Sequence, residues 1–114
     1  MSMNVKLRHV SGVTVLDLSG KITLGEGSIG LRDAVRDALA AGSRKILLNI
    51  GDVTYIDSAG LGELVAAYTS VKNAGGDLKL TNLSKKVKDL LVITKLLTVF
   101  DVKEDEKDAI AAFQ

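Results

Sequence analysis

The apolar run KILLNI, residues 45–50, constrains the fold of this chain more than any other segment. A nearly unbroken apolar run of this length is typical of a central strand that is buried on both faces of a sheet. Further along the chain, apolar residues recur at helical spacing and predict an amphipathic helix: Leu61, Leu64, Val65, Tyr68 and Val71. Gly75 and Gly76 are expected to end that helix. A buried strand followed by such a helix indicates an α/β fold.

The rest of the chain continues this alternation of strands and helices. Residues 4–10 and 13–20 alternate polar and apolar side chains around the turn Ser11-Gly12, which predicts a β-hairpin. After a glycine-rich loop over 20–28, the further elements expected are a helix carrying Leu31, Val35, Ala38 and Leu39 that ends at Gly42, a strand over 77–82, a helix over 84–97, a strand over 98–102 and a helix over 104–113. We therefore expect residues 1–114 to form a single α/β domain, a mixed β-sheet with helices packed on it.

The composition excludes several classes of protein. The 114 residues include no cysteine, which rules out disulfides, thiol catalysis and zinc–thiolate sites and suits a reducing cytoplasm. Residues 1–10 have no signal-peptide pattern, and no apolar run approaches the roughly 20 residues that cross a bilayer. The 15 basic and 14 acidic residues give a net charge of +1, which offers no reason to expect direct contact with nucleic acid or a membrane. We expect a cytoplasmic protein.

The sequence lacks the motifs of an enzyme. The only histidine, His9, lies in a predicted strand, and without cysteines it leaves no set of transition-metal ligands. Ser58 is not a hydrolase nucleophile of the G-x-S-x-G type, because position 56 is Ile. GEGSIG, 25–30, has the glycine spacing of a dinucleotide site, but the next strand does not end in the acidic residue that such a site needs. We interpret it as a loop and helix start, and expect no catalytic residue, cofactor or metal.

The segment YIDSAGLG, at the start of the second helix, is where we expect a functional site. Asp57 or Ser58 would cap the helix, since both residue types are preferred caps. A cap alone does not explain why Ala59, Gly60 and Gly62 leave the first turn almost without side chains. A bare helix N-terminus exposes backbone N–H groups that favour a negative group. We therefore expect the fold to tolerate a phosphate on Ser58, which would change the surface that a partner meets.

The segment LNIGDVTYIDSAGLG, 48–62, resembles the STAS domain family, and in particular the bacterial anti-sigma factor antagonists. The resemblance extends over the hairpin that ends in Gly20, Asn49 in the central strand, the Gly75-Gly76 stop and the tail KKVKDLLVITKLLTVFDV. It implies that Ser58 is the phosphoacceptor of an anti-sigma factor that is itself a serine kinase using ATP. It also implies that the unmodified antagonist binds this kinase and frees the sigma factor, that phosphorylation breaks the complex, and that a serine phosphatase restores it.

One position departs from the family pattern. The loop after the second strand commonly reads Gly-x-Leu-Asp in this family, whereas here Thr23 stands where the Asp would be. Either kinase recognition is weakened by this change, or Glu26 substitutes for the missing carboxylate. The partner-binding residues that we expect surround this loop and the phosphoacceptor: Asp57, Ser58, Ala59, Gly60, Gly62, Thr23 and Glu26.

Two other classes of function remain as alternatives. The first is a STAS subunit of a larger assembly, such as a stressosome or a lipid-transport complex, although an N-terminal sensor domain of the stressosome type is not expected here. The second is an enzyme that uses Ser58 as its nucleophile, which would need an adjacent base, and no such base is identifiable. We therefore expect a binding module, not an enzyme.

Overall fold

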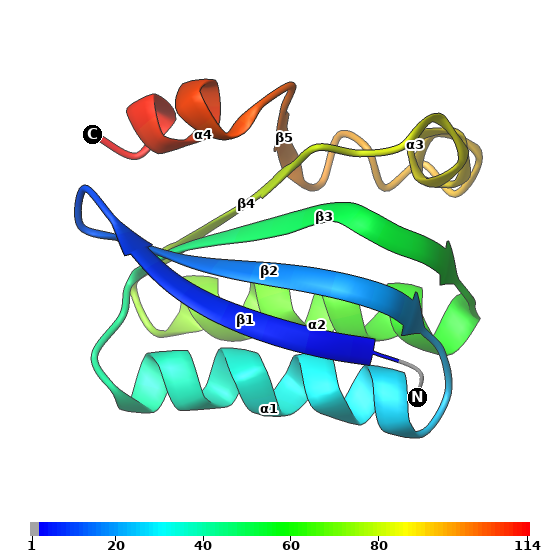
Figure 1. Cartoon of the computed structure of the whole chain (residues 1–114), viewed down its shortest axis with the longest axis horizontal. Helices are drawn as coiled ribbons and strands as arrows, with labels where there is room; N and C mark the ends of the chain where they lie inside the picture. Colours follow the sequence, from blue (N-terminus) through cyan, green and yellow to red (C-terminus); the bar gives the residue numbers. More distant parts are fainter. Residues whose placement is uncertain (1–2) are drawn as a thin grey trace.

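The computed structural model describes residues 3–114 and orders them as alternating strands and helices (Figure 1). The elements are β1 (Met3–Val10), β2 (Val13–Ile22), α1 (Glu26–Ala40), β3 (Lys45–Ile56), α2 (Ser58–Asn73), β4 (Asp77–Thr81), α3 (Lys85–Ile93), β5 (Asp101–Lys103) and α4 (Glu106–Ala112). The strands form one sheet in the order β1-β2-β3-β4-β5. β1 is antiparallel to β2 and the other neighbours are parallel, so the predicted hairpin and the mixed α/β sheet are both confirmed.

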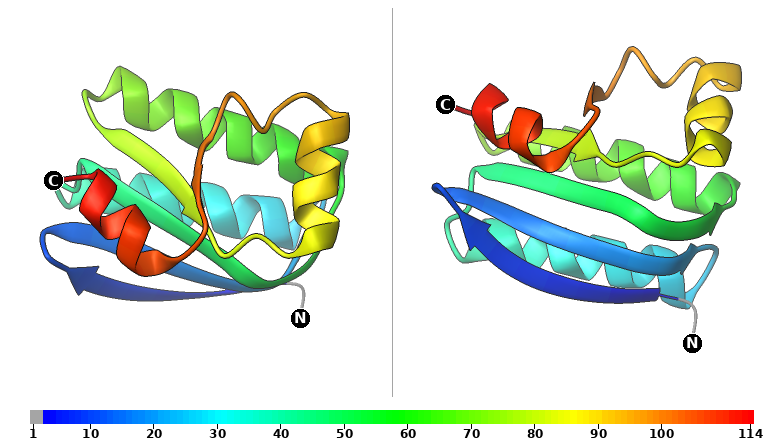
Figure 2. Two further views of the ribbon diagram at one scale, coloured as in Figure 1. Left: turned by 90° about the horizontal axis from the view of Figure 1, so that it is seen from above. Right: turned by 45° about the horizontal axis from the view of Figure 1, so that its top comes forward.

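The helices lie on both sides of the sheet. α1 and α2 run side by side along one face, while α3 and α4 lie on the opposite side, with α3 over the C-terminal end of β3 (Figures 1 and 2). We call the first the α1/α2 face and the second the α4 face. A β-hairpin joins β1 to β2 at Ser11 and Gly12, which have φ angles of 51° and 81°. Glycine adopts this left-handed region without strain, which explains its place in the turn.

The core is divided by the alternation of side chains along β2 and β3. On the α1/α2 face, buried aliphatic side chains of the sheet and of the two helices form the larger cluster: Leu16, Leu18, Ile46, Leu48, Ile50, Leu31, Val35, Leu64 and Val71. The α4 face has a smaller cluster of Val13, Val15, Leu47, Ala109 and Phe113. The run KILLNI is therefore buried on both faces from Ile46 to Leu48, as the sequence predicts for a central strand.

Several predicted boundaries are wrong. β3 continues to Ile56, because its second half pairs with β2 from Ser19 to Ile22 and buries Val53 and Ile56. The predicted strand covered only residues 45–50, because the apolar run ends there and polar residues follow. The helix predicted over 84–97 ends at Ile93, where Thr94 caps it and Lys95 turns left-handed with a φ of 62°. The last strand is correspondingly shifted, to Asp101–Lys103 instead of 98–102.

The motif GEGSIG forms the start of α1, which is the helix start that we expected. Gly25 precedes the helix with a φ of 92°, and the helix begins at Glu26. A Cβ on Gly27 would lie 2.5 Å from the carbonyl oxygen of Lys21, so this glycine lets α1 pack directly against the end of β2. Its spacing therefore serves the packing of a helix on a strand.

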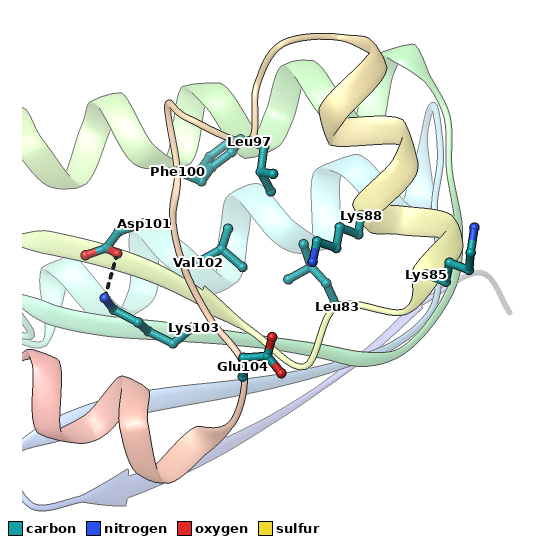
Figure 3. Close-up of a pocket in the computed structure, with 9 residues that line it drawn as sticks. All are labelled: Leu83, Lys85, Lys88, Leu97, Phe100, Asp101, Val102, Lys103 and Glu104. Atoms are coloured by element: carbon teal, nitrogen blue, oxygen red, sulfur yellow. Dashed lines mark ion pairs between the residues drawn. The ribbon is translucent and has the colours of Figure 1, made fainter.

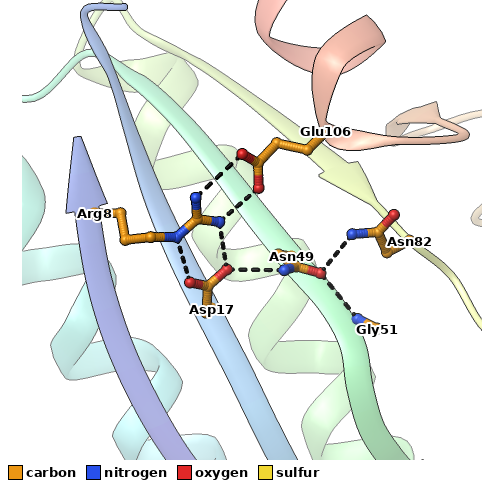
Figure 4. Close-up of polar contacts among 6 residues, drawn as sticks. All are labelled: Arg8, Asp17, Asn49, Gly51, Asn82 and Glu106. Carbon is orange, nitrogen blue, oxygen red and sulfur yellow. Dashed lines mark hydrogen bonds and ion pairs between the residues drawn. The ribbon is translucent and has the colours of Figure 1, made fainter. Parts of the chain in front are cut away.

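A polar network on the α4 face attaches the last helix to the sheet (Figure 4). Arg8 donates from Nε to Asp17 Oδ2 at 2.6 Å and from Nη2 to Glu106 Oε1 at 2.5 Å. Asn49 donates to Asp17 Oδ1 at 2.8 Å and accepts from Asn82 at 3.0 Å. The Arg8 side chain, followed by burial and by Asn49, sets the pKa of Asp17, with a net shift below its ordinary value. The network therefore links β1, β2, β3 and α4 through one arginine and two carboxylates.

Candidate functional site

The candidate site lies where β3 ends and α2 begins. Asp57 is the N-cap of α2, with extended backbone angles, and its Oδ1 accepts a hydrogen bond from the backbone N–H of Gly60 at 2.8 Å. Of the two caps that the sequence allowed, the structure therefore selects Asp57. Ser58 is the first residue of the helix and its side chain is exposed. The hydroxyl is free of the capping role and faces outward at a helix N-terminus.

The second carboxylate oxygen of Asp57 holds the neighbouring loop in place. Oδ2 accepts from the backbone N–H of Leu24 at 3.0 Å, and the Asp57 N–H donates to the carbonyl of Ile22 at 3.3 Å. The backbone N–H groups of Leu24 and Gly60 lower the pKa of Asp57. The residue thus fixes the β2–α1 loop beside the phosphoacceptor candidate and keeps a negative charge next to it. The Leu24 N–H therefore lies against the residue that precedes Ser58.

The two glycines of the first turn have different surroundings. A Cβ on Gly60 would lie 2.0 Å from the carbonyl oxygen of Ile22, whereas a Cβ on Gly62 would meet nothing within 4 Å. Gly60 is buried and lets the helix approach the end of β2, and Gly62 is exposed. The prediction of an open first turn is therefore correct at Gly62 and wrong at Gly60, whose N–H is already bonded to Asp57. Close packing, which spacing alone does not reveal, is the reason for Gly60.

The other predicted residues lie around this site with different exposures. Ala59 is half-buried in the first turn of α2, and Thr23 is half-buried in the loop, where its carbonyl accepts from the Ser28 N–H at 2.9 Å. Glu26 is exposed at the start of α1. Thr23, Glu26 and the Asp57–Gly62 turn are thus carried by two adjoining connections at the same end of the sheet (Figure 1).

Large apolar side chains around the site were not predicted from the sequence. Leu24, whose N–H is held by Asp57, leaves 80% of its surface exposed, and Ile29 of α1 is also exposed. Tyr55, at the end of β3, is 45% exposed, and Ile93 at the end of α3 is 77% exposed. Apolar residues gathered around a polar centre are typical of protein interaction sites. The only sequence signal was an apolar residue within a turn, as at Leu24.

An ion pair between the two long helices was also missed. Glu63 of α2 is buried, and its Oε1 accepts from Arg32 of α1 at 2.9 Å. The sequence shows Glu63 only as a polar residue beside the apolar positions of α2. Its partner lies 31 positions earlier in the chain and could not be identified without the fold. The pair links the helices whose first turns border the site.

Within residues 3–114, the Ser58 hydroxyl has no hydrogen bond to another side chain, and no cluster of three or more potential metal ligands occurs. None of the helices that the structure describes is long and apolar enough to cross a membrane.

Comparisons with known proteins agree with this geometry. A STAS domain model matches residues 4–109. The anti-sigma-B factor antagonist of Bacillus subtilis (strain 168) is 32% identical over 102 residues, which cover 90% of this chain and 92% of that protein. A candidate anti-sigma factor antagonist from Thermotoga maritima has a TM-score of 0.87 at 26% identity, covering 96% of this chain and 93% of that one.

A further solved structure resembles this chain in fold alone. The phosphorylated form of the Bacillus cell fate determinant SpoIIAA has a TM-score of 0.72 at 19% identity, covering 97% of this chain and all of that one (100%). The match of the family model extends from β1 into α4 and includes the whole candidate site. This chain belongs to the STAS domain family.

Proposed function

We propose that this protein is an anti-sigma factor antagonist whose binding is switched by phosphorylation of Ser58. In the proposed cycle the unmodified protein binds an anti-sigma factor that is a serine kinase, and the sigma factor is released. The kinase transfers the terminal phosphate of ATP to the Ser58 hydroxyl, the complex separates, and a serine phosphatase restores the first state. The observation that carries the proposal is the exposed Ser58 hydroxyl at a helix N-terminus, next to a charged cap and within a rim of apolar side chains.

The switch is proposed to act through charge at the interface and not through the fold. A phosphate adds about −1.5 to −2 charges near pH 7. The helix N-terminus offsets part of a negative charge, but Asp57 already occupies the N–H groups of Gly60 and Leu24. The phosphate would therefore project beside a second negative charge at the surface. Like charges brought together at an interface cost several kcal/mol, and about 1.4 kcal/mol is a tenfold loss of affinity.

The residues around Ser58 are proposed to form the surface that the partner contacts, with small side chains that expose the backbone of the first turn. Ala59 and Gly62 add little or no side chain to the first turn, so that a partner can approach the hydroxyl closely. Gly60 acts indirectly, because its contact with Ile22 sets the position of the turn against β2. Thr23 and Glu26 border the turn from the β2–α1 connection. The relatives named as anti-sigma factor antagonists support this assignment of partner.

Titration calorimetry with the anti-sigma factor kinases of the source organism tests the proposal. Ser58→Asp should keep the wild-type melting temperature, because Asp57 is the cap, and should bind the kinase at least about tenfold more weakly. Ser58→Ala should bind and resist phosphorylation. Ser70→Asp, which adds the same charge at an exposed position later in α2, is the matched control and should bind normally. Equal affinities for Ser58→Asp and the wild type would contradict the electrostatic switch.

The absence of catalysis in this chain has its own measurement. Mass spectrometry after incubation with ATP alone should detect no added phosphate, since no base is placed beside Ser58 in the described residues. Addition of the kinase should add one phosphate at Ser58. A phosphate gained without any other protein would show that the chain is an enzyme and would overturn this part of the proposal.

A further inference from the structure

A small apolar cleft opens between the end of β3 and helix α3, close to Ser58. We call it the Tyr55 cleft; it has a volume of about 260 Å³ and is lined by Thr54, Tyr55, Ile56, Lys86, Val87, Asp89, Leu90 and Ile93. Tyr55 and Ile93 stand at its rim with large exposed areas, and Val92 is exposed next to Ile93. Exposed apolar side chains that surround a hollow are a feature of interaction sites. The described part of the chain supplies no side chain that fills it.

The charged residues that line the Tyr55 cleft are Lys86 and Asp89, and Asp89 is paired with Lys85. The first half of α3 carries Lys85, Lys86 and Lys88, and no acidic residue lies in its first turn. Cations at a helix N-terminus are unfavourable for the helix itself, because they oppose its dipole. Lys85 pairs with Asp89 at 2.9 Å, whereas Lys86 lies over the Tyr55 ring, 5.4 Å from its centre, and forms no ion pair within residues 3–114. The cleft thus presents an unpaired cation beside an aromatic ring.

The opposite side of α3 borders a second hollow. A larger pocket of about 670 Å³ lies between α3 and β5, and Lys88 extends along it while Lys85 points away (Figure 3). Asp101 and Glu104 line the same pocket, and Lys103 pairs with Asp101 at 3.4 Å. Charges of both signs line both hollows, and the Tyr55 cleft differs in that its lysine lies over an aromatic ring. We therefore place the acidic contact of a partner on the side of Lys86, where an aromatic ring lies beneath the cation.

The position of the Tyr55 cleft relative to the phosphoacceptor decides which partner fits it. Tyr55 precedes the Asp57 cap by two residues on the same strand end, and Leu24 is held on the other side of Asp57 by its N–H. Ser58 therefore lies between two apolar areas, one around Leu24 and one around the cleft. A partner that covers the Ser58 hydroxyl would thus meet the strand end that also lines the cleft.

We infer that the Tyr55 cleft receives an apolar side chain of the same anti-sigma factor, flanked by carboxylates of that protein that face Lys86. This inference rests on the proposed function and names a second contact in the same complex. Apolar anchors that fill a pocket near the centre of an interface contribute most of the affinity in protein complexes. A carboxylate next to Lys86 adds a salt-sensitive contribution. Binding then combines a contact at Ser58 that phosphorylation removes with a contact at α3 that it does not.

Two variants of the cleft test this inference by calorimetry with the anti-sigma factor kinase that binds the wild type. Ile93→Ser shortens the rim at an exposed position, and Lys86→Glu reverses the charge over Tyr55. Each should keep the wild-type melting temperature and bind at least about tenfold more weakly. The loss for Lys86→Glu should shrink as salt is raised, whereas the loss for Ile93→Ser should not. Wild-type affinity in both variants would overturn the inference.

The controls place the same chemical changes away from the cleft. Leu7→Ser removes an exposed aliphatic side chain from β1, and Lys107→Glu reverses an exposed charge on α4. Both should bind like the wild type, and an equal loss in them would show an effect unrelated to the cleft. Weak binding of Ser58→Asp together with unchanged binding of the cleft variants would overturn this inference and leave the proposed function intact. No binding of the wild type to any anti-sigma factor kinase would overturn both.

Discussion

The two faces of the sheet are stabilised in different ways. On the α1/α2 face, β2 and β3 contribute Leu16, Leu48 and Ile50 to a fully buried aliphatic cluster that two long helices cover. On the α4 face, the same strands contribute Val15 and Leu47 at one end and then change to Asp17 and Asn49. The first face is closed by packing, while the second is closed in part by a charged network. A closely packed face is destabilised by substitutions that change the volume of a side chain, whereas a hydrogen-bonded network is destabilised by the loss of one partner.

The largest loss of stability is expected on the α1/α2 face. Leu64 of α2 is fully buried, and Leu64→Ala should lower the free energy of unfolding by about 2–5 kcal/mol, because it removes apolar contacts and leaves a cavity. Leu24→Ala is the matched control, since Leu24 is mostly exposed, and it should change stability by less than about 0.5 kcal/mol. Urea titration measures both. A loss below about 0.5 kcal/mol for Leu64→Ala would contradict the closed core.

A smaller loss is expected where α2 meets the end of β2. A methyl group on Gly60 would lie 2.0 Å from the Ile22 carbonyl oxygen, so Gly60→Ala must move the helix or the strand. Overpacking of this kind costs about 1–3 kcal/mol. Because Asp57 binds both Gly60 and Leu24, the displacement should also disturb the loop beside Ser58. Amide hydrogen exchange should therefore become faster at Leu24 as well as in α2. An unchanged exchange rate at Leu24 would show that the loop beside Ser58 does not depend on the position of α2.

On the α4 face, Arg8→Ala should cost about 1–2 kcal/mol, since Asp17 and Glu106 lose charged hydrogen bonds. The loss should depend on pH. The pKa of Asp17 is lowered in the folded protein. The ionised Asp17 therefore contributes to the free energy of unfolding above its unfolded pKa of about 3.9, and this contribution disappears as the pH falls through the pKa of the folded protein. Wild type should thus lose more stability than Arg8→Ala between about pH 5 and pH 3. Urea titrations at several pH values measure this, and parallel curves of unfolding free energy against pH for the two proteins would show that Asp17 is not coupled to Arg8.

The difference between the faces also explains how much the sequence could predict. The α1/α2 face follows from the run KILLNI and from the spacing of Leu61 and Leu64, because burial leaves a periodic pattern. The α4 face depends on contacts such as Arg8 with Glu106, which are 98 positions apart and leave no local pattern. The second half of β3 was missed for the same reason, since its polar residues pair with β2 at an exposed end of the sheet.

The candidate site was predictable where local chemistry defines it and not where packing does. Asp57 and Ser58 were identified from the preferences of helix caps and from the bare turn that follows them. The burial of Gly60 and the hydrogen bond from Leu24 to Asp57 depend on the approach of β2, which spacing does not encode. The Tyr55 cleft combines residues of β3 and α3, so that only the folded chain brings them together.

The smallest effect is expected at Gly62, and it sharpens the contrast with Gly60. Gly62 lies within α2, is exposed, and has open space where a Cβ would be. Gly62→Ala should therefore raise the free energy of unfolding by about 0.5–1 kcal/mol, because alanine loses less backbone entropy in a helix than glycine. Thermal melts of Gly60→Ala and Gly62→Ala should shift in opposite directions. If Gly62→Ala also weakens binding of the anti-sigma factor kinase while it stabilises the fold, then the missing side chain at this position is needed for partner binding and not for the helix. An unchanged affinity would show that the partner does not approach this turn closely.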